Sequence, residues 1–157
     1  MELNQLTAIS PIDGRYRNQV SQLDEFFSEF ALIKYRVIIE VEYFLFLAEK
    51  KFFKLPAKSK QQLNSIIANF SIADAQQIKS IEATTNHDVK AVEYFLKQQF
   101  DSIGIGALKE WIHFGLTSQD INNTAIPLSW KHCMEHEYLP AMINAQNKLV
   151  ALAQEWK

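Results

Sequence analysis

Apolar residues recur at helical spacing over a long stretch of the N-terminal third of the chain. Ser21 and Asp24 have the spacing of a capping box, in which two residues satisfy the free backbone N–H groups at a helix start. Lys50 and Lys51 carry the positive charge favoured at a helix C-terminus, and Pro56 prevents continuation. The pattern predicts one long helix from about Ser21 to Lys51. Its apolar positions are Phe27, Phe30, Ala31, Ile33, Val37, Ile38, Val41 and Leu45.

Shorter helical patterns follow. Apolar residues on one side predict a helix over 59–69, and Ser71 with Asp74 has capping-box spacing for a third helix that continues to about residue 82. Residues 83–87 include two threonines and an asparagine, which are poor in helix interiors. We therefore expect a loop there, leading into an amphipathic helix that contains Val89.

The last third of the chain has the pattern of another long helix. Thr117, Ser118 and Asp120 form a typical helix start, and apolar residues keep helical spacing up to the last residues. Pro127 and Pro140 lie inside this pattern, and we expect them to bend or interrupt the helix.

Strand signals are nearly absent. The chain has four Gly and four Pro, and Asp13-Gly14 is its one dipeptide typical of a hairpin turn. The sequence therefore predicts an all-α fold.

Composition limits the function classes. A length of 157 residues and a hydrophobic content of 48% fit one domain with a real core. The net charge of −2 gives no broad attraction for nucleic acid or anionic membranes, and no stretch reaches the roughly 20 apolar residues of a membrane span. Residues 1–10 do not have the pattern of a secretion signal, and the lone Cys133 excludes an internal disulfide framework. These features are typical of a cytoplasmic protein.

Two of the three arginines lie close together in the arginine segment, residues 10–17. Arg15 and Arg17 could bind a phosphate or carboxylate through paired hydrogen bonds, and Gly14 would fix a turn nearby. The alternative interpretation is a surface turn whose arginines are solvated.

Two further polar segments each lead into a predicted helix. The histidine segment, residues 84–90 (T-T-N-H-D-V-K), could bind an anion at the helix N-terminus, with His87 as hydrogen-bond donor or proton carrier. The Thr-Ser segment, residues 113–123 (H-F-G-L-T-S-Q-D-I-N-N), could present two hydroxyls to an anion. Simple helix capping would also explain both segments, and His113 between aromatic residues is typical of a packed, hydrogen-bonded histidine.

Residues 132–136 (H-C-M-E-H) match the H-x-x-E-H spacing of inverted zinc peptidases. A catalytic zinc site needs a further protein ligand, and only 21 residues follow His136. A solvated helix face with a buried Cys133 is the simpler interpretation, and a zinc hydrolase stays an alternative.

Taken together, S-P-I-D-G-R-Y at 10–16, T-T-N-H-D-V-K-A-V-E-Y-F-L-K at 84–97 and H-F-G-L-T-S-Q-D-I-N-N at 113–123 resemble the adenylosuccinate lyase family of the fumarase and aspartase superfamily. The resemblance covers essentially the whole chain and is weakest between residues 52 and 77. It implies an N-terminal helical domain at 1–115, and at 116–157 the beginning of the superfamily's central helical bundle.

The resemblance also implies a function for the longer protein. Such enzymes release fumarate from adenylosuccinate, giving AMP, and from succinylated aminoimidazole carboxamide ribotide, in purine nucleotide biosynthesis. They are cytoplasmic homotetramers whose active sites are shared between subunits, and they use no metal and no organic cofactor. Their catalytic base is a serine on a mobile loop and their acid is a histidine in a T-H-G-Q motif. Neither motif occurs in these 157 residues, so we expect this chain alone to be inactive.

The family's substrate-binding residues correspond to positions in all three segments. Arg15 and Tyr16 would contact the nucleotide part of the substrate, and Asn86, His87 and Asp88 would line the pocket. Thr117 and Ser118 would bind the succinyl carboxylates, and His87 would assist binding and orientation without being the acid. Gln119 stands where many relatives have an acidic residue. A non-enzymatic alternative is a helical interaction module that exposes the apolar face around Trp156.

Overall fold

The computed structural model describes residues 1–10 and 13–157, and within these residues it contains helices and no strand. This confirms the predicted all-α fold. The helical elements in chain order are α1 (Asp13–Val20), the 3-10 turn η1 (Ser21–Leu23), α2 (Asp24–Phe27), α3 (Glu29–Glu49), α4 (Ala57–Ala68), α5 (Ile72–Thr85), α6 (Asp88–Ser102), the 3-10 segment η2 (Gly106–Trp111), α7 (Ser118–Cys133), the π-helical segment η3 (Met134–Tyr138) and α8 (Leu139–Glu155).

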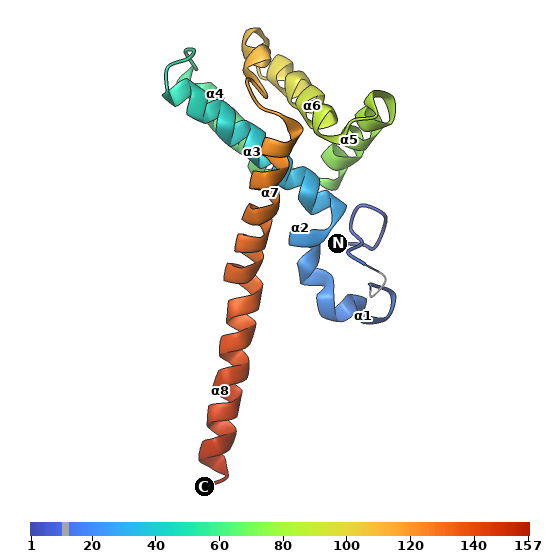
Figure 1. Cartoon of the computed structure of the whole chain (residues 1–157), viewed down its shortest axis with the longest axis vertical. Coiled ribbons are helices and arrows are strands. Elements are labelled where there is room, and N and C mark those ends of the chain that lie inside the picture. Colours follow the sequence, from blue (N-terminus) through green and yellow to red (C-terminus); the bar gives the residue numbers. More distant parts are fainter. Residues whose placement is uncertain (11–12) are drawn as a thin grey trace.

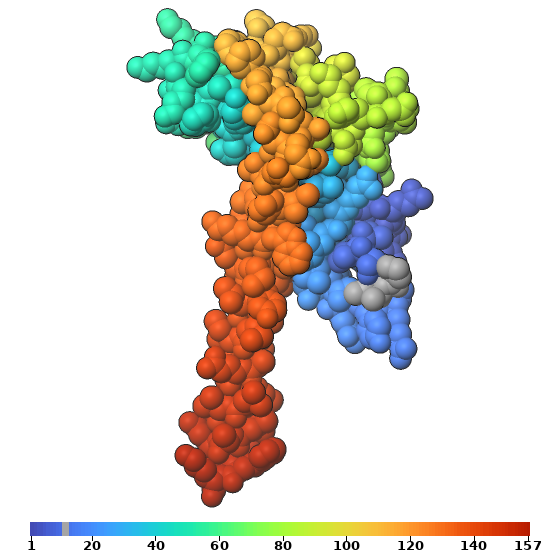
Figure 2. Space-filling model, in the orientation of Figure 1, coloured from blue at the N-terminus to red at the C-terminus, as the bar shows by residue number. Residues whose placement is uncertain are grey.

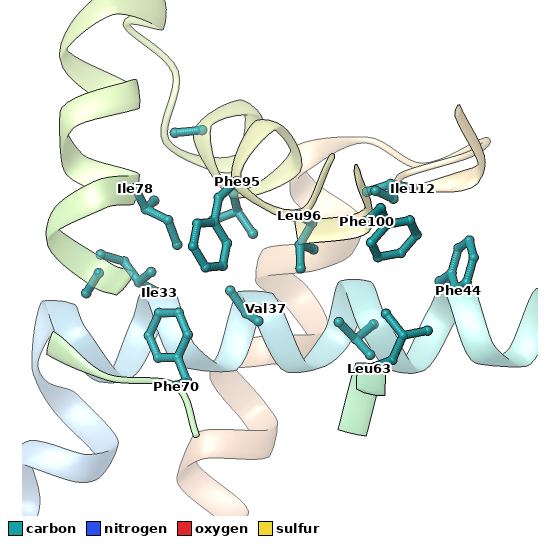
Figure 3. Close-up of a cluster of buried hydrophobic side chains, with 14 of the residues drawn as sticks. Ile33, Val37, Phe44, Leu63, Phe70, Ile78, Phe95, Leu96, Phe100 and Ile112 are labelled. Atoms are coloured by element: carbon teal, nitrogen blue, oxygen red, sulfur yellow. The ribbon is translucent and has the colours of Figure 1, made fainter. Parts of the chain in front are cut away.

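The core forms where α3 packs against α4, α5 and α6. Apolar side chains of α3, among them Val37 and Phe44, meet Phe95 and Phe100 of α6 in the cluster drawn in Figure 3. Leu63 of α4 joins the same cluster and is fully buried. Because these residues come from three helices, their burial fixes the helices relative to one another.

The long N-terminal helix begins later than its pattern predicts. The chain is extended at Ser28 (φ −79°, ψ 167°), and the Ser28 hydroxyl accepts a hydrogen bond from the N–H of Ala31 at 3.1 Å. Ser28 is therefore the N-cap of α3, and the prediction of a start at Ser21 is wrong, because Ser21 begins a separate 3-10 turn. The capping box predicted at Ser71 and the helix start predicted at Thr117 are confirmed, and Thr117 also forms a capping box with Asp120.

The chain ends in a long helical rod. α7 packs along α3 and then continues through η3 into α8, which extends away from the rest of the molecule (Figures 1 and 2). Pro127 does not interrupt α7. The wider π turn lies just before Pro140, whose nitrogen has no hydrogen to donate, and there the N–H of Leu139 bonds to the carbonyl of Met134. None of the helices among the described residues has the length and apolarity that a membrane crossing requires.

Candidate functional site

The arginine segment separates its two arginines into different roles. Arg17 donates to Asp13 Oδ1 at 2.9 Å and forms a second ion pair with Asp24, and both carboxylates are buried. Backbone N–H donation from Ser10 at 2.6 Å, together with Arg17, holds the pKa of Asp13 below its usual value despite burial. Through its ion pair with Asp24, Arg17 therefore connects α1 to α2.

Arg15 and Tyr16 face the solvent. Both are exposed, and the Arg15 guanidinium lies 5.4 Å from the centre of the Tyr16 ring. Of the two arginines in the segment, Arg15 is therefore the one whose guanidinium is exposed to an anionic ligand. Pro11, which belongs to the same motif, lies outside the described residues.

The histidine segment forms the tight junction between α5 and α6. Asn86 ends α5 in the left-handed conformation (φ 49°), and His87 is the N-cap of α6. The His87 Nδ1 atom accepts a hydrogen bond from the Lys90 N–H at 3.1 Å. An imidazole nitrogen that accepts cannot carry the ring's proton, so the neutral ring has its N–H at Nε2. The side chain is 50% exposed, which leaves this N–H able to donate to a ligand.

Both oxygens of the Asp88 carboxylate have partners within the protein. One carboxylate oxygen accepts from its neighbouring Val89 N–H at 2.8 Å, and the other pairs with Arg36 Nη2 at 2.7 Å. Burial would raise the pKa of Asp88, but the Val89 N–H and the Arg36 guanidinium outweigh it and lower the pKa below the usual value. Asp88 is therefore an anion whose charge is already balanced.

The Thr-Ser segment starts α7. The Asp120 carboxylate accepts from the Thr117 N–H at 2.7 Å and from the Thr117 hydroxyl at 2.9 Å. Thr117 is exposed, and Ser118, in the first turn of the helix, is half-buried. Because the first backbone N–H groups of a helix have no partner within it, this end can accept an anionic oxygen.

Arg36 of α3 joins the histidine and Thr-Ser segments. Besides its ion pair with Asp88, its Nε donates to Asn122 Oδ1 at 2.9 Å, and Asn122 lies in α7 one turn beyond Ser118. Most of α6 and a 3-10 segment separate the two segments in the sequence, yet both contact the same guanidinium. Arg36 therefore contacts both Asp88 and Asn122.

The arginine segment does not join this group within one chain. Figure 1 shows α1 at the lower right of the molecule, well separated from α5 and α6 at the top. The structure thus connects through Arg36 the two segments that hold five of the seven candidate site residues, and it leaves Arg15 and Tyr16 apart. The five are Asn86, His87, Asp88, Thr117 and Ser118.

A buried acid supports the backbone just before the Thr-Ser helix start. The side chain of Glu40 is fully buried in α3, and its Oε1 lies 2.5 Å from Nδ1 of His113, whose φ is +59°. Among the residues that the structure describes, none bonds to the second oxygen, Oε2. Burial raises the pKa of Glu40, and the contact with His113 opposes that rise.

Glu40 gives a prediction about pH. A carboxyl whose pKa is higher in the folded than in the unfolded chain stabilises the fold fully when the pH is below the unfolded pKa, which is 4.5 for Glu40. This contribution is lost as the pH rises through the folded pKa. Relative to Glu40→Gln, which keeps the shape and a polar group facing His113, the wild-type chain should gain stability as the pH falls from 7 toward 4.5. Urea unfolding of both proteins at several pH values measures this, and parallel profiles would contradict it.

The H-x-x-E-H residues do not form a metal site of the described chain. His132 Nδ1 is hydrogen-bonded to the Tyr35 hydroxyl at 2.9 Å, and the His132 and His136 rings are 6.1 Å apart. Within residues 1–10 and 13–157, no group of three or more His, Cys, Asp and Glu side chains is placed to hold a metal ion. Nothing in this geometry supports the zinc hydrolase alternative.

A family model and individual known proteins both match this chain, and all of these matches are lyases. A family model described as a lyase matches residues 14–157. Adenylosuccinate lyase of Dictyostelium discoideum is 50% identical over 169 residues, which include 100% of this chain and 35% of that protein. The Vibrio cholerae adenylosuccinate lyase is 46% identical over 162 residues, with 100% and 36% covered, and that of Escherichia coli strain K12 is 48% identical over 145 residues, with 89% and 32% covered.

The chain spans about a third of the length of the curated relatives it matches. The matching family model covers nearly all of its residues, and the similarity to adenylosuccinate lyases lies in their N-terminal part. The chain therefore belongs to the lyase family and is similar to the N-terminal part of adenylosuccinate lyases.

Proposed function

We propose that the complete protein is an adenylosuccinate lyase, which releases fumarate from adenylosuccinate to give AMP and from succinylated aminoimidazole carboxamide ribotide. The observation that carries the proposal is an identity of 44% to 50% with several adenylosuccinate lyases over all or most of the chain. Such a reaction would place the protein in purine nucleotide biosynthesis in the cytoplasm, and in this proposal it uses no metal or organic cofactor.

The chemistry is a β-elimination. A base removes a proton from the carbon beside a carboxylate, the bond from carbon to nitrogen breaks, and an acid protonates the departing nitrogen. Donors near the carboxylate stabilise the negative charge that develops in the transition state. In the proposal, the base and the acid come from segments of the protein outside these 157 residues, because the serine loop and T-H-G-Q motif of the family do not occur here.

The residues of this chain would bind and orient the substrate. His87 would donate its Nε2 hydrogen to a substrate oxygen, since Nδ1 is occupied by the Lys90 N–H. Thr117 and Ser118 would receive a succinyl carboxylate at the α7 N-terminus, where free N–H groups and the helix dipole favour an anion. Asn86 and Asp88 would shape the pocket wall around them.

Arg15 and Tyr16 would bind the nucleotide part of a substrate, in a site completed by another subunit. Their separation from the histidine segment supports this assignment, because one chain does not place all seven residues around a single ligand (Figure 1). We therefore propose a homotetramer whose active sites are shared between subunits.

The C-terminal rod supports an assembly of this kind. Ile143 and Leu149 on α8 and Trp156 directly after it are 57%, 68% and 78% exposed, and apolar surface on this scale is typical of an interface. In the proposal, residues 1–115 form an N-terminal helical domain and residues 116–157 begin the central helical bundle. A free-standing interaction module would also use this face, but it would have no need of the three polar segments.

Fumarate release tests the proposal. We expect the full-length protein to convert adenylosuccinate to AMP and fumarate, followed by absorbance, and the 157-residue chain alone to show no turnover, because it lacks the acid and the base. Inactivity of the full-length protein would contradict the proposal. If the 157-residue chain then also failed to bind AMP, the interaction-module interpretation would become the better one.

A further inference from the structure

One buried arginine lies outside the three polar segments and yet contacts two of them. Arg36 is 6% exposed, so its guanidinium has lost most of its water. A buried charge is costly unless ion pairs and hydrogen bonds replace that water. In this protein the replacements are the Asp88 carboxylate at 2.7 Å and the Asn122 amide oxygen at 2.9 Å.

The partners of Arg36 stand next to the proposed ligand-binding groups. Asp88 follows His87 directly and is the first residue of α6. Asn122 lies four residues after Ser118, which corresponds to about 6 Å along α7. The position of His87 relative to Ser118 therefore depends on a connection that passes through one guanidinium.

The geometry of that guanidinium limits how far the two segments can move. Its Nε and Nη2 hydrogens point in fixed directions within one plane, whereas the ammonium group of lysine is a single point charge with rotating hydrogens. Arg36 uses Nε for Asn122 and Nη2 for Asp88. A lysine would keep the positive charge beside Asp88 without being able to hold both partners at the same separation.

We propose that Arg36 is a positioning residue for the lyase reaction, which holds the His87 donor at a fixed separation from the anion site at Thr117 and Ser118. The inference rests on the proposed function. Since a displacement of about 1 Å between groups that hold a substrate can lower a rate about 100-fold, loss of this connection should reduce turnover more than substrate binding.

The test uses Arg36→Lys, Asn122→Ala and the double variant in the full-length protein. Each single variant should lower kcat about 10- to 100-fold, with KM within about threefold of wild type, because the charge and the groups that contact substrate remain. The double variant should be little worse than Arg36→Lys, because both changes break the same connection.

A matched variant distinguishes positioning from general stability. Leu63 is fully buried in α4 and lies outside the three segments, so Leu63→Ala should lower the unfolding temperature without lowering kcat at a temperature where the protein is folded. If Arg36→Lys keeps a kcat within about twofold of wild type, or if Leu63→Ala loses as much kcat, the positioning role is wrong.

Hydrogen exchange gives a second readout that does not depend on turnover. Arg36→Lys should speed amide exchange in residues 84–90 and 117–122 together, and Leu63→Ala should not. Unchanged exchange in either segment would overturn the inference. An inactive wild-type enzyme would contradict the proposed function, and the exchange measurement would still decide the role of Arg36.

Discussion

Replacing His87 with asparagine in the full-length protein should lower kcat/KM about 100- to 1,000-fold and leave the unfolding temperature nearly unchanged. The loss has the size expected when one fixed donor to a developing negative charge is removed. Asparagine is among the best N-cap residues, so its side-chain oxygen can accept the Lys90 N–H that His87 Nδ1 accepts now. The variant therefore removes the Nε2 donor while the start of α6 is kept.

The matched control for this variant is Ser71→Ala. Ser71 is the N-cap of α5 and forms a capping box with Asp74, away from the three polar segments. Loss of that cap should cost about 1 kcal/mol of stability and leave kcat/KM unchanged. Steady-state kinetics and thermal unfolding of both variants make the comparison. A His87→Asn enzyme with wild-type kcat/KM would show that His87 is only a helix cap.

Local sequence signals predicted most of the helices, because caps and apolar periodicity act over a few residues. Ser71 with Asp74 and Thr117 with Asp120 are helix starts in the structure, as expected. The prediction that the long helix starts at Ser21 was wrong for a physical reason. Both Ser21 and Ser28 can cap a helix, and the buried hydroxyl of Ser28 also donates to the Asp24 carbonyl at 2.6 Å, so tertiary burial favours the later start.

The site was predictable only where its residues are close in sequence. The spacing of the arginine segment left two interpretations open, anion binding or a surface turn with solvated arginines. Arg17 fits neither, because it is paired with Asp13 and with Asp24, which lies outside that segment. Such a pairing depends on how α1 turns back on α2, which a linear pattern does not specify. Arg15 alone retains the exposure that a ligand contact requires.

Two supporting residues were missed because their partners are distant in the chain. Glu40 pairs with His113 across 73 residues, and Arg36 bonds to Asn122 across 86. The available signal was the helical spacing that places both residues on the same face of α3 as its buried apolar residues. A charged group on a buried face needs a partner. That signal indicates that partners exist, but the identity of the partners depends on the packing of α3 against α6 and α7.

The largest effect on stability is expected at the aromatic cluster of α3. Phe44 is 1% exposed, and its ring centre lies 4.6 Å from that of Phe53 and 4.7 Å from that of Phe100. Figure 3 shows Phe44 beside Phe100. Phe44→Ala should lower the free energy of unfolding by about 3–5 kcal/mol, because it removes buried apolar surface and leaves a cavity between α3 and α6. The midpoint of urea unfolding of the 157-residue chain measures this loss.

Phe46, two residues further along α3, provides the matched control. It is 49% exposed, so Phe46→Ala deletes the same atoms from the same helix but creates no internal cavity, and the expected change is within about 0.5 kcal/mol. Equal losses in the two variants would contradict the assignment of Phe44 to the core. If Phe44→Ala proves too unstable to measure, Phe44→Leu should show a smaller loss, because it refills part of the space. The same cluster includes Ile112, the residue before His113, so loosening it should also speed amide exchange at the start of the Thr-Ser segment.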